Sequence, residues 1–305
     1  MRPFRFAAMV ERGRSATHWS EVARRAEALG YDTLLMPDHI TDQLALIPAL
    51  TAAAGATTTL RVGSFVFAND YRNPVLLARE AATLDFLSGG RFEFGIGAGW
   101  KTSDYDQLGI PYDPPKTRVD RMEEAVVLIK RLWTEEHVSH QGAHYRVHDA
   151  TVLPRPIQRP HPPVMIGGGG PRILRIAARE AQIVSLLPPV DARGRRHIRS
   201  MTLASVSEGV ARLRRAERFA ELELNVIVTD AQVTDARQPL LAAVAAHLKS
   251  AVTAIVATPF FLYGSRASLV EDLLERRARL GISYIALPGG AMRAFAPVVA
   301  ELRGK

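Results

Sequence analysis

The chain has 305 residues, 47% of them hydrophobic and 23% charged, a composition typical of a soluble globular protein with a sizeable core. It contains no cysteine, which excludes disulfides, thiol nucleophiles and thiolate metal sites. No apolar stretch is long enough to span a membrane and the first residues lack a secretory pattern, so we expect a cytoplasmic protein with no membrane partner.

The net charge of +8 indicates either an acidic partner or an arginine-rich composition without functional meaning. A nucleic-acid-binding protein usually concentrates its positive charge in one stripe with aromatic residues between the charges. The arginines of this chain are instead scattered along its predicted helices. We therefore expect an anionic small-molecule ligand and no nucleic acid.

Short apolar runs and longer amphipathic runs alternate along the whole chain. The short runs predict eight β-strands, at residues 4–10, 33–36, 60–67, 92–97, 164–166, 183–187, 223–228 and 284–287. Apolar residues at helical spacing predict helices at residues 19–29, 44–57, 74–84, 118–133, 171–181, 207–220, 239–247 and 269–280.

This alternation predicts a parallel sheet with helices outside it, which makes the chain an α/β protein. Eight strand–helix units in about 300 residues fit a TIM (β/α)8 barrel with insertions. The main insertions are predicted at about residues 100–116, 134–163 and 188–202. No break in composition divides the chain, so we expect one domain over residues 1–305. An open, doubly wound sheet is the alternative.

The residues that end the predicted strands form the candidate site, because the active site of a TIM barrel lies at the carboxyl ends of its strands. Glycines and polar residues collect after several of these strands, which predicts the mouth of a ligand pocket. The candidate residues are Asp38, His39, Ser64, Phe65, Val66, Asn69, Gly97, Gly99, Trp100, Gly167, Gly168, Gly169, Gly170, Pro171, Arg172 and Ser185.

Four consecutive glycines, Gly167–Gly170, follow the fifth predicted strand and precede Pro171, which suits the first turn of a helix. An exposed helix start offers unpaired N–H groups and a positive dipole end, and both suit a phosphate. Arg172 either adds positive charge there or is simply solvated. We expect this segment to bind a phosphate; the alternative is a flexible turn.

His39 and the preceding Asp38 are the best acid/base candidates, because a histidine donates or accepts protons near neutral pH. The alternative is that His39 packs or forms hydrogen bonds at the end of its strand. Trp100 and Phe65 are candidates to face a planar ring, although the sequence alone favours core packing for Phe65.

Four histidines crowd one predicted insertion, at residues 137, 140, 144 and 148. The segment alternates like a β-hairpin, with Gln141–Gly142 as its turn. Alternation would split the histidines between two faces, and no carboxylate recurs at useful spacing. We therefore expect no metal site.

A series of short motifs runs along nearly the whole chain. They are Met36–His39, Arg72–Pro74, Ala78–Arg91, Gly95–Trp100, Arg118–Arg121, Gly142–Tyr145, Pro154–Pro156 and Pro162–Gly168. With these motifs in this order, the chain resembles the luciferase-like monooxygenase superfamily, in particular its branch of oxidoreductases that use the deazaflavin coenzyme F420.

The resemblance implies a TIM-type barrel with insertions, often dimeric, so we expect a homodimer. It implies a flavin-like ring at the carboxyl ends of the strands, backed by a bulge with a non-prolyl cis peptide at about Phe65–Val66. It also implies that Gly167–Gly170 hold the cofactor phosphate and that His39 lies near the reactive face of the ring.

Two departures bear on the reaction. The sugar-phosphate and alcohol dehydrogenases of this branch have a tryptophan a few residues after the matching histidine, where this chain has Thr41–Leu44. They also have an acid after the matching glycines, where this chain has Trp100. The resemblance therefore favours hydride transfer from reduced deazaflavin to an activated C=C or C=N bond of a small organic substrate over alcohol oxidation.

F420 is the expected cofactor, because its polyanionic tail suits a chain with a net charge of +8. FMN, which ends in a single phosphate, is the alternative. Two further functions therefore stay open, an FMN-dependent monooxygenase and a non-catalytic flavin-binding relative.

Overall fold

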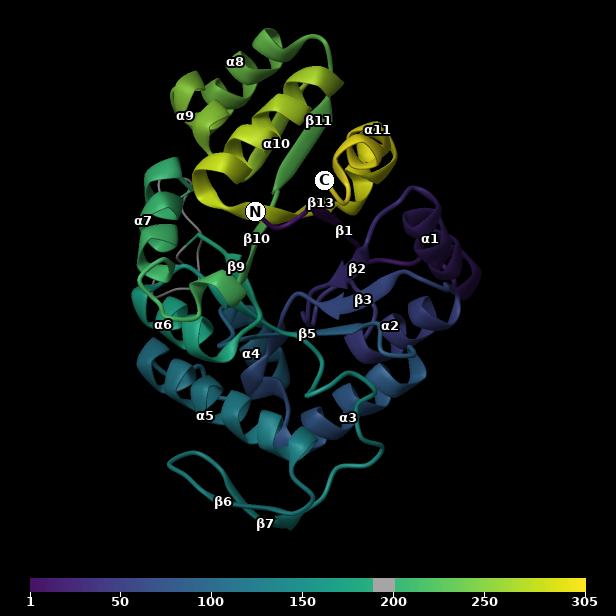
Figure 1. Ribbon diagram of the computed structural model, residues 1–305, viewed down its shortest axis with the longest axis vertical. Helices are drawn as coiled ribbons and strands as arrows, with labels where there is room; N and C mark the ends of the chain where they lie inside the picture. The colour runs from purple at the N-terminus through teal and green to yellow at the C-terminus, as the bar shows by residue number, and fades with distance from the viewer. Residues whose placement is uncertain (189–200) are drawn as a thin grey trace.

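The computed structural model describes residues 1–188 and 201–305, which form a closed barrel of parallel strands surrounded by helices (Figure 1). Residues 189–200, in the insertion predicted at 188–202, lie outside the described residues. The barrel strands are β1 (Arg5–Met9), β2 (Thr33–Met36), β3 (Arg61–Ser64), β4 (Phe67–Ala68), β5 (Phe92–Gly97), β8 (Val164–Gly168), β9 (Ile183–Leu186), β10 (Glu223–Ile227) and β13 (Ile282–Pro288).

Two strand pairings close the barrel. β1 pairs with β2 on one side and with β13 on the other, so the first and last strands are neighbours. β3 pairs with β5, which joins the two ends of the remaining sheet. β3 and β4 both pair with β5 and act as one interrupted strand, so the nine strands occupy eight positions. The predicted TIM barrel is confirmed, and the open-sheet alternative is wrong.

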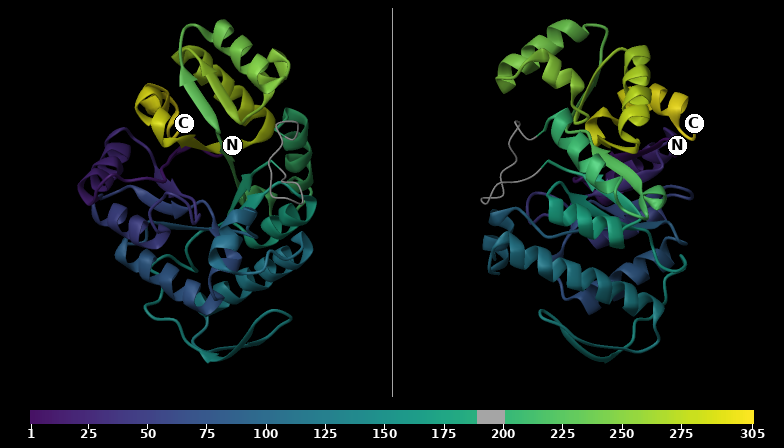
Figure 2. Two further views of the ribbon diagram at one scale, coloured as in Figure 1. Left: turned by 180° about the vertical axis from the view of Figure 1, so that it is seen from behind. Right: turned by 60° about the vertical axis from the view of Figure 1, so that its left-hand side comes forward.

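Helices pack on the outer face of the barrel (Figures 1 and 2). They are α1 (Ala16–Ala28), α2 (Leu46–Gly55), α3 (Pro74–Leu87), α5 (Pro115–Thr134), α6 (Pro171–Glu180), α7 (Leu203–Leu213), α10 (Arg266–Leu280) and α11 (Met292–Leu302). Side-chain caps fix where several begin. Ser15 accepts a hydrogen bond from the amide of His18 at the start of α1, and Asn73 accepts one from Val75 at the start of α3.

Several elements differ from the prediction. The strand expected at 60–67 is interrupted between β3 and β4. The helix expected at 207–220 ends at Leu213, and only a short 3-10 turn, Phe219–Glu221, follows it. The short helix α4 (Thr102–Leu108) and the last helix, α11, were not predicted. α4 is a polar segment of seven residues, which is too short to display an apolar period.

A second small sheet lies beyond the barrel, at the top of Figure 1. It consists of β11 (Asp230–Val233) paired in parallel with β12 (Phe261–Gly264). The helices α8 (Arg237–Leu248) and α9 (Val252–Ala257) pack against β12. Neither this sheet nor α9 was predicted. Its own apolar cluster consists of Leu241, Ala245, Ile255, Phe261 and Tyr263.

The histidine-rich insertion forms the predicted hairpin, with β6 (Val138–Gln141) antiparallel to β7 (Arg146–Ala150). Glu124 of α5 holds the hairpin against the barrel. Its carboxylate contacts His140 Nε2 at 3.0 Å and accepts the amide N–H groups of His144 and Tyr145, both at 2.9 Å. His140 and His144 thus lie in a structural contact between a helix and a hairpin, and His137 contacts Asp149 within the hairpin at 2.9 Å.

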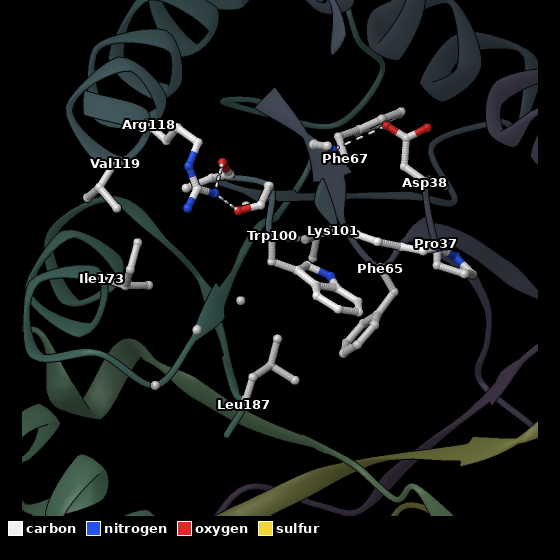
Figure 3. A pocket seen from close by; sticks show the side chains of 18 of the residues that line it. Pro37, Asp38, Phe65, Phe67, Trp100, Lys101, Arg118, Val119, Ile173 and Leu187 are labelled. Carbon is white, nitrogen blue, oxygen red and sulfur yellow. Dashed lines mark hydrogen bonds between the residues drawn. The ribbon is translucent and has the colours of Figure 1, made fainter. Parts of the chain in front are cut away.

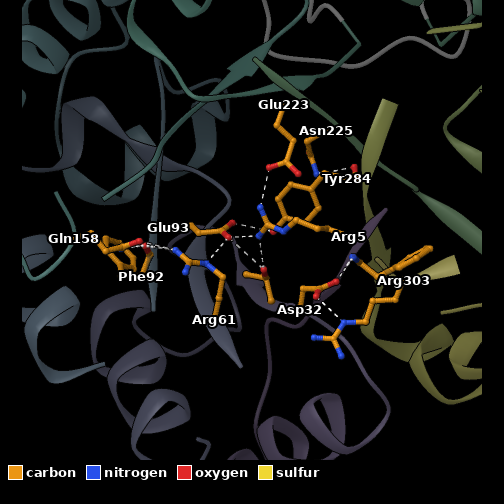
Figure 4. A network of polar contacts seen from close by, with 12 residues as sticks. Arg5, Asp32, Arg61, Phe92, Glu93, Gln158, Glu223, Asn225, Tyr284 and Arg303 are labelled. Atoms are coloured by element: carbon orange, nitrogen blue, oxygen red, sulfur yellow. Dashed lines mark hydrogen bonds and ion pairs between the residues drawn. The ribbon is translucent and has the colours of Figure 1, made fainter. Parts of the chain in front are cut away.

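A buried ion network fills the amino-terminal end of the barrel interior (Figure 4). Glu93 of β5 is 1% exposed and accepts hydrogen bonds from Arg5 and, at 2.8 Å, from Arg61. The Tyr284 hydroxyl donates to the same carboxylate at 3.0 Å, and Arg5 also donates to Glu223 at 2.8 Å. Burial alone would raise the pKa of Glu93, but the guanidinium groups of Arg5 and Arg61 outweigh burial and lower it.

We predict that Glu93→Gln lowers the free energy of unfolding by about 1–3 kcal/mol, because the half-buried guanidinium groups of Arg5 and Arg61 lose a charged hydrogen-bond partner, although Arg5 keeps Glu223. A carboxyl with a depressed folded-state pKa stabilises the protein above its unfolded pKa, and this stabilisation is lost as pH falls through the folded value. The difference between wild type and variant should therefore shrink as pH falls below about 4.3. Urea unfolding at several pH values measures both effects.

Glu135→Gln is the matched control for this prediction. Glu135 pairs with Arg131 at 2.8 Å, and both side chains are well exposed, at 43% and 35%. An exposed ion pair contributes little to stability, because solvent screens it. If Glu93→Gln and Glu135→Gln lower the free energy of unfolding equally at neutral pH, the ion network around Glu93 stabilises the protein no more than an exposed ion pair does.

Candidate functional site

A cavity of about 750 Å³ opens at the carboxyl-terminal ends of the barrel strands (Figure 3). Most of the sequence-predicted residues line it, although they lie far apart in the chain. Those that do are Asp38, His39, Phe65, Val66, Gly97, Gly99, Trp100, Gly167, Gly168, Gly169, Gly170, Pro171 and Arg172.

Three predicted side chains lie elsewhere. Ser64 is fully buried and exchanges hydrogen bonds with the backbone of Gly95, which ties β3 to β5. Asn69 is 2% exposed and donates to the Tyr145 hydroxyl at 3.0 Å. Ser185 is fully buried and donates to a side chain of the neighbouring strand at 2.7 Å. These three side chains therefore do not line the cavity, because Ser64 and Ser185 bind the barrel wall and Asn69 binds the β6–β7 hairpin.

The interruption between β3 and β4 forms part of the pocket wall. The peptide bond between Phe65 and Val66 is cis, as the family resemblance implied. Phe65 is 7% exposed, and its side chain both packs in the barrel interior and points into the cavity (Figure 3). A Cβ atom on Gly97 would come within 2.7 Å of the Val66 side chain, so this wall requires a glycine beside it.

Arg118 of α5 holds the loop that follows β5. Its guanidinium donates to the carbonyl of Gly99 and, at 3.3 Å, to the carbonyl of Ala98 (Figure 3). Arg118 is 4% exposed, and its Cζ lies 4.1 Å from the centre of the Tyr112 ring. These contacts fix the loop from which the Trp100 ring projects into the cavity. Arg118 belongs to the motif Arg118–Arg121 that supported the family resemblance, but no role in the site was predicted for it, because its helix covers the outside of the barrel.

The carboxylate of Asp38 is held by contacts within the protein. Arg72 binds it through two hydrogen bonds, at 2.6 and 3.1 Å, and the amide of Ala68 donates to it at 3.2 Å. Asp38 is 6% exposed. These contacts join the end of β2 to β4 and favour a structural role for Asp38, while its catalytic role stays a prediction.

His39 has a different partner, which sequence analysis missed. Its Nδ1 lies 2.6 Å from Oδ2 of Asp104, which is fully buried in α4. The Trp100 ring meets the imidazole edge-on, with ring centres 5.5 Å apart. Asp104 escaped notice because it follows His39 by 65 residues and lies in a short, unpredicted helix.

The glycine run connects β8 to α6 and lies on another side of the cavity. Gly170 caps α6, and Pro171 occupies its first turn, as predicted. A Cβ atom on Gly170 would meet nothing within 4 Å, so the start of this helix is open. Its free N–H groups are suited to bind an anion.

The cations beside the glycine run are already paired. Arg172 contacts Asp120 and, at 3.2 Å, Glu123, while Lys116 contacts Asp120 at 2.9 Å. An anion at the start of α6 would therefore depend mainly on backbone N–H groups. Much of the remaining wall is apolar, from Met9, Val119, Ile173, Leu187 and Ile227, none of which sequence analysis singled out.

Metal-binding clusters and membrane-spanning helices are both absent from residues 1–188 and 201–305. No group of three histidine or acidic side chains in this part of the chain is arranged to hold a metal ion. None of its helices is both long and apolar enough to cross a membrane.

A family model described as luciferase-like monooxygenase matches residues 1–286. The chain belongs to this family. The resemblance that its motifs indicated is thus confirmed, together with the barrel that the luciferase-like family adopts.

Curated relatives in the luciferase-like family include F420-dependent and FMN-dependent proteins. The F420-dependent glucose-6-phosphate dehydrogenase of Intrasporangium calvum is 34% identical over 215 residues, which are 66% of this chain and 63% of the relative. The FMNH(2)-dependent dimethylsulfone monooxygenase of Pseudomonas putida is 30% identical over 165 residues, 52% of this chain and 45% of the relative. The chain therefore spans less than two thirds of the length of each.

Solved structures share the fold over the whole chain. An F420-dependent secondary alcohol dehydrogenase in complex with an F420–acetone adduct has a TM-score of 0.79 at 17% identity, covering 99% of both chains. The coenzyme F420-dependent tetrahydromethanopterin reductase of Methanopyrus kandleri has a TM-score of 0.77 at 18% identity, covering 99% of this chain and 100% of its own. At such low sequence identities, the structural similarity establishes only that the chain shares the luciferase-like barrel.

We predict that Asp38→Asn lowers the free energy of unfolding by about 1–3 kcal/mol, because it removes a charge-assisted, bidentate contact with Arg72. Urea unfolding measures the loss.

Asp42→Asn is the control in the same loop, because the Asp42 side chain is 90% exposed and its carboxylate lies 3.6 Å from the guanidinium of Arg12. That variant should stay within about 0.5 kcal/mol of wild type. Equal stability of Asp38→Asn and wild type would refute a structural role for Asp38.

Proposed function

We propose that the protein is a coenzyme F420-dependent oxidoreductase that transfers hydride from the reduced deazaflavin to an activated C=C or C=N bond of a small organic substrate. The observation that carries the proposal is that His39 and the open start of α6 line one apolar cavity at the carboxyl ends of the strands. The cavity volume, about 750 Å³, lies within the range of cofactor and ligand sites.

The residues present fit a flavin-like cofactor. The N–H groups at the start of α6 would hold its phosphate, and no side chain at Gly170 obstructs them. Phe65 and Trp100 offer aromatic surfaces to a planar ring (Figure 3). When bound, the reduced cofactor supplies the hydride.

His39 supplies the proton that completes the reduction. One hydride and one proton add across the double bond of the substrate, so the π bond breaks and two bonds to hydrogen form. Because Nδ1 of His39 is held by Asp104, Nε2 is the nitrogen that can donate to the substrate. His39 is neutral after this step and regains a proton from solvent.

The walls of the cavity favour an apolar substrate over a sugar phosphate. Much of the wall is apolar, and the cations Lys116 and Arg172 are both paired with Asp120. Among the residues that the structure describes at this rim, a second phosphate, on a substrate, would therefore find Lys116 and Arg172 already occupied by carboxylates. This supports reduction of an unsaturated bond over oxidation of a sugar phosphate, the substrate named for the relative from Intrasporangium calvum.

An FMN-dependent monooxygenase is the second candidate, favoured by the 30% identity to the dimethylsulfone monooxygenase of Pseudomonas putida. F420 is preferred because its tail is polyanionic and the chain has a net charge of +8. The two candidates differ in their use of oxygen, since a deazaflavin transfers hydride and scarcely reacts with oxygen.

The test of the proposed function has two stages. Purified protein is titrated with F420 and with FMN, and we expect F420 to bind at least about tenfold more tightly. Reduced F420 is then mixed with conjugated enones and imines without oxygen, and oxidation of the cofactor is followed by absorbance. Tighter binding of FMN together with oxygen consumption would establish the monooxygenase instead. Binding of either cofactor with no turnover would indicate a non-catalytic flavin-binding protein.

We predict that Gly170→Asp weakens F420 binding about 10–100-fold, whereas Gly170→Asn weakens it less than about threefold. Gly170 has φ −72° and ψ 148°, and both Asp and Asn are favoured as helix caps, so both variants should fold. Only Asp places a negative charge beside the bound phosphate. Fluorescence titration at low and high salt measures the difference. Equal affinities of the two variants would place the phosphate away from α6.

A further inference from the structure

We infer that Asp104 is a positioning residue, which holds His39 in the tautomer that carries a proton on Nδ1 and directs Nε2 to the substrate. This inference rests on the proposed function for its catalytic meaning. It concerns a contact within the chain, however, so it can be tested without cofactor or substrate.

The contact between the two side chains is short, and one partner is buried. His39 Nδ1 lies 2.6 Å from Asp104 Oδ2, within the range of a charge-assisted hydrogen bond. The Asp104 side chain is 0% exposed and that of His39 is 22% exposed, so the imidazole lies between a buried carboxylate and the cavity. Nδ1 and Nε2 are on opposite sides of the ring, which leaves Nε2 turned away from the carboxylate.

One further hydrogen bond and one ion pair hold the carboxylate in place. The Tyr71 hydroxyl donates to Oδ2 at 3.2 Å, and Lys101 Nζ lies 3.3 Å from Oδ1. His39, Tyr71 and Lys101 come from the ends of three different strand positions in the barrel, after β2, β4 and β5. Asp104 is therefore fixed by several segments at once, which is what a rigid support for a histidine requires.

The further neighbours of Asp104 are a hydroxyl donor and a cation, which are the usual partners of a carboxylate. Lys101 is its nearest cation, and Tyr71 stays protonated because burial and the nearby Asp104 carboxylate raise its pKa. The other carboxylate of this region, Asp38, is neutralised by Arg72. An ionised carboxylate accepts hydrogen bonds and cannot donate one. Nδ1 of His39 must then carry the proton, and Nε2 is the position that gains or loses one.

The contact between Asp104 and His39 also explains what Asp104 contributes during turnover. It prevents rotation of the imidazole, so that Nε2 stays directed away from the buried carboxylate and available at the cavity. The imidazolium form of His39 is the form that gives up a proton to the substrate. The Asp104 carboxylate, 2.6 Å from Nδ1, thus maintains both the orientation and the tautomer of the His39 ring.

The first experiment reads the tautomer directly. The intact protein is prepared with ¹⁵N-labelled histidine, and its ring nitrogens are observed by NMR without ligand, with His39→Gln used to assign the signals. We expect the neutral His39 ring to carry its proton on Nδ1. In Asp104→Asn the amide nitrogen donates to Nδ1, so we expect the proton to move to Nε2. A wild-type ring with its proton on Nε2 would overturn the inference without need of any variant.

The second experiment measures the catalytic consequence. Asp104→Asn should lower kcat for oxidation of reduced F420 by about 10²–10⁴-fold, while the dissociation constant for F420 changes less than about threefold. Asp104→Glu, which keeps the charge, should recover part of the loss. Asp106→Asn is the control, because Asp106 lies in the same helix and is exposed, and it should retain wild-type kcat.

The outcomes separate the two proposals. If the tautomer changes as expected but wild type never oxidises reduced F420, the proposed function fails and the positioning role of Asp104 stands. If wild type turns over and Asp104→Asn has an unchanged tautomer or unchanged kcat, the inference fails and the proposed function stands. A parallel loss of F420 affinity and kcat in Asp104→Asn would mark Asp104 as a general structural residue and also overturn the inference.

Discussion

Closure of the sheet is the constraint on which the site depends. Pairing of β1 with β13 and of β3 with β5 brings the carboxyl ends of eight parallel strand positions to one rim. Residues as distant in sequence as His39 and Gly170 therefore line one cavity. No local segment could achieve this, because each strand end supplies only a few side chains to the rim. The proposed chemistry therefore depends on the closed topology of the barrel more than on any single sequence motif.

The barrel interior is divided along its axis into layers of different character. The amino-terminal end holds the charged side chains around Glu93, which are bound to one another. Above them lies an apolar layer to which Leu35, Met165 and Phe65 belong. The cavity follows at the carboxyl end. The apolar layer keeps the charges at the base away from the charges near His39, so each set is balanced by its own partners.

The sequence predicted the fold well and the site in part, for physical reasons. The alternation of strand and helix patterns specifies a barrel, and the rim rule then identifies strand-end residues such as His39 and Trp100. Ser64 and Ser185 were misplaced because the direction of a side chain depends on strand register and pairing, which no local pattern encodes. Asp104 was missed because its role exists only through a contact made across the fold.

The division of the rim into loops has a consequence for which of them can vary. His39 and Asp104 follow β2 and β5, whereas the open start of α6 follows β8. The contact between His39 and Asp104 couples the loops after β2 and β5, whereas the start of α6 is anchored by β8. Loops after the other strands can therefore change in length without disturbing either feature.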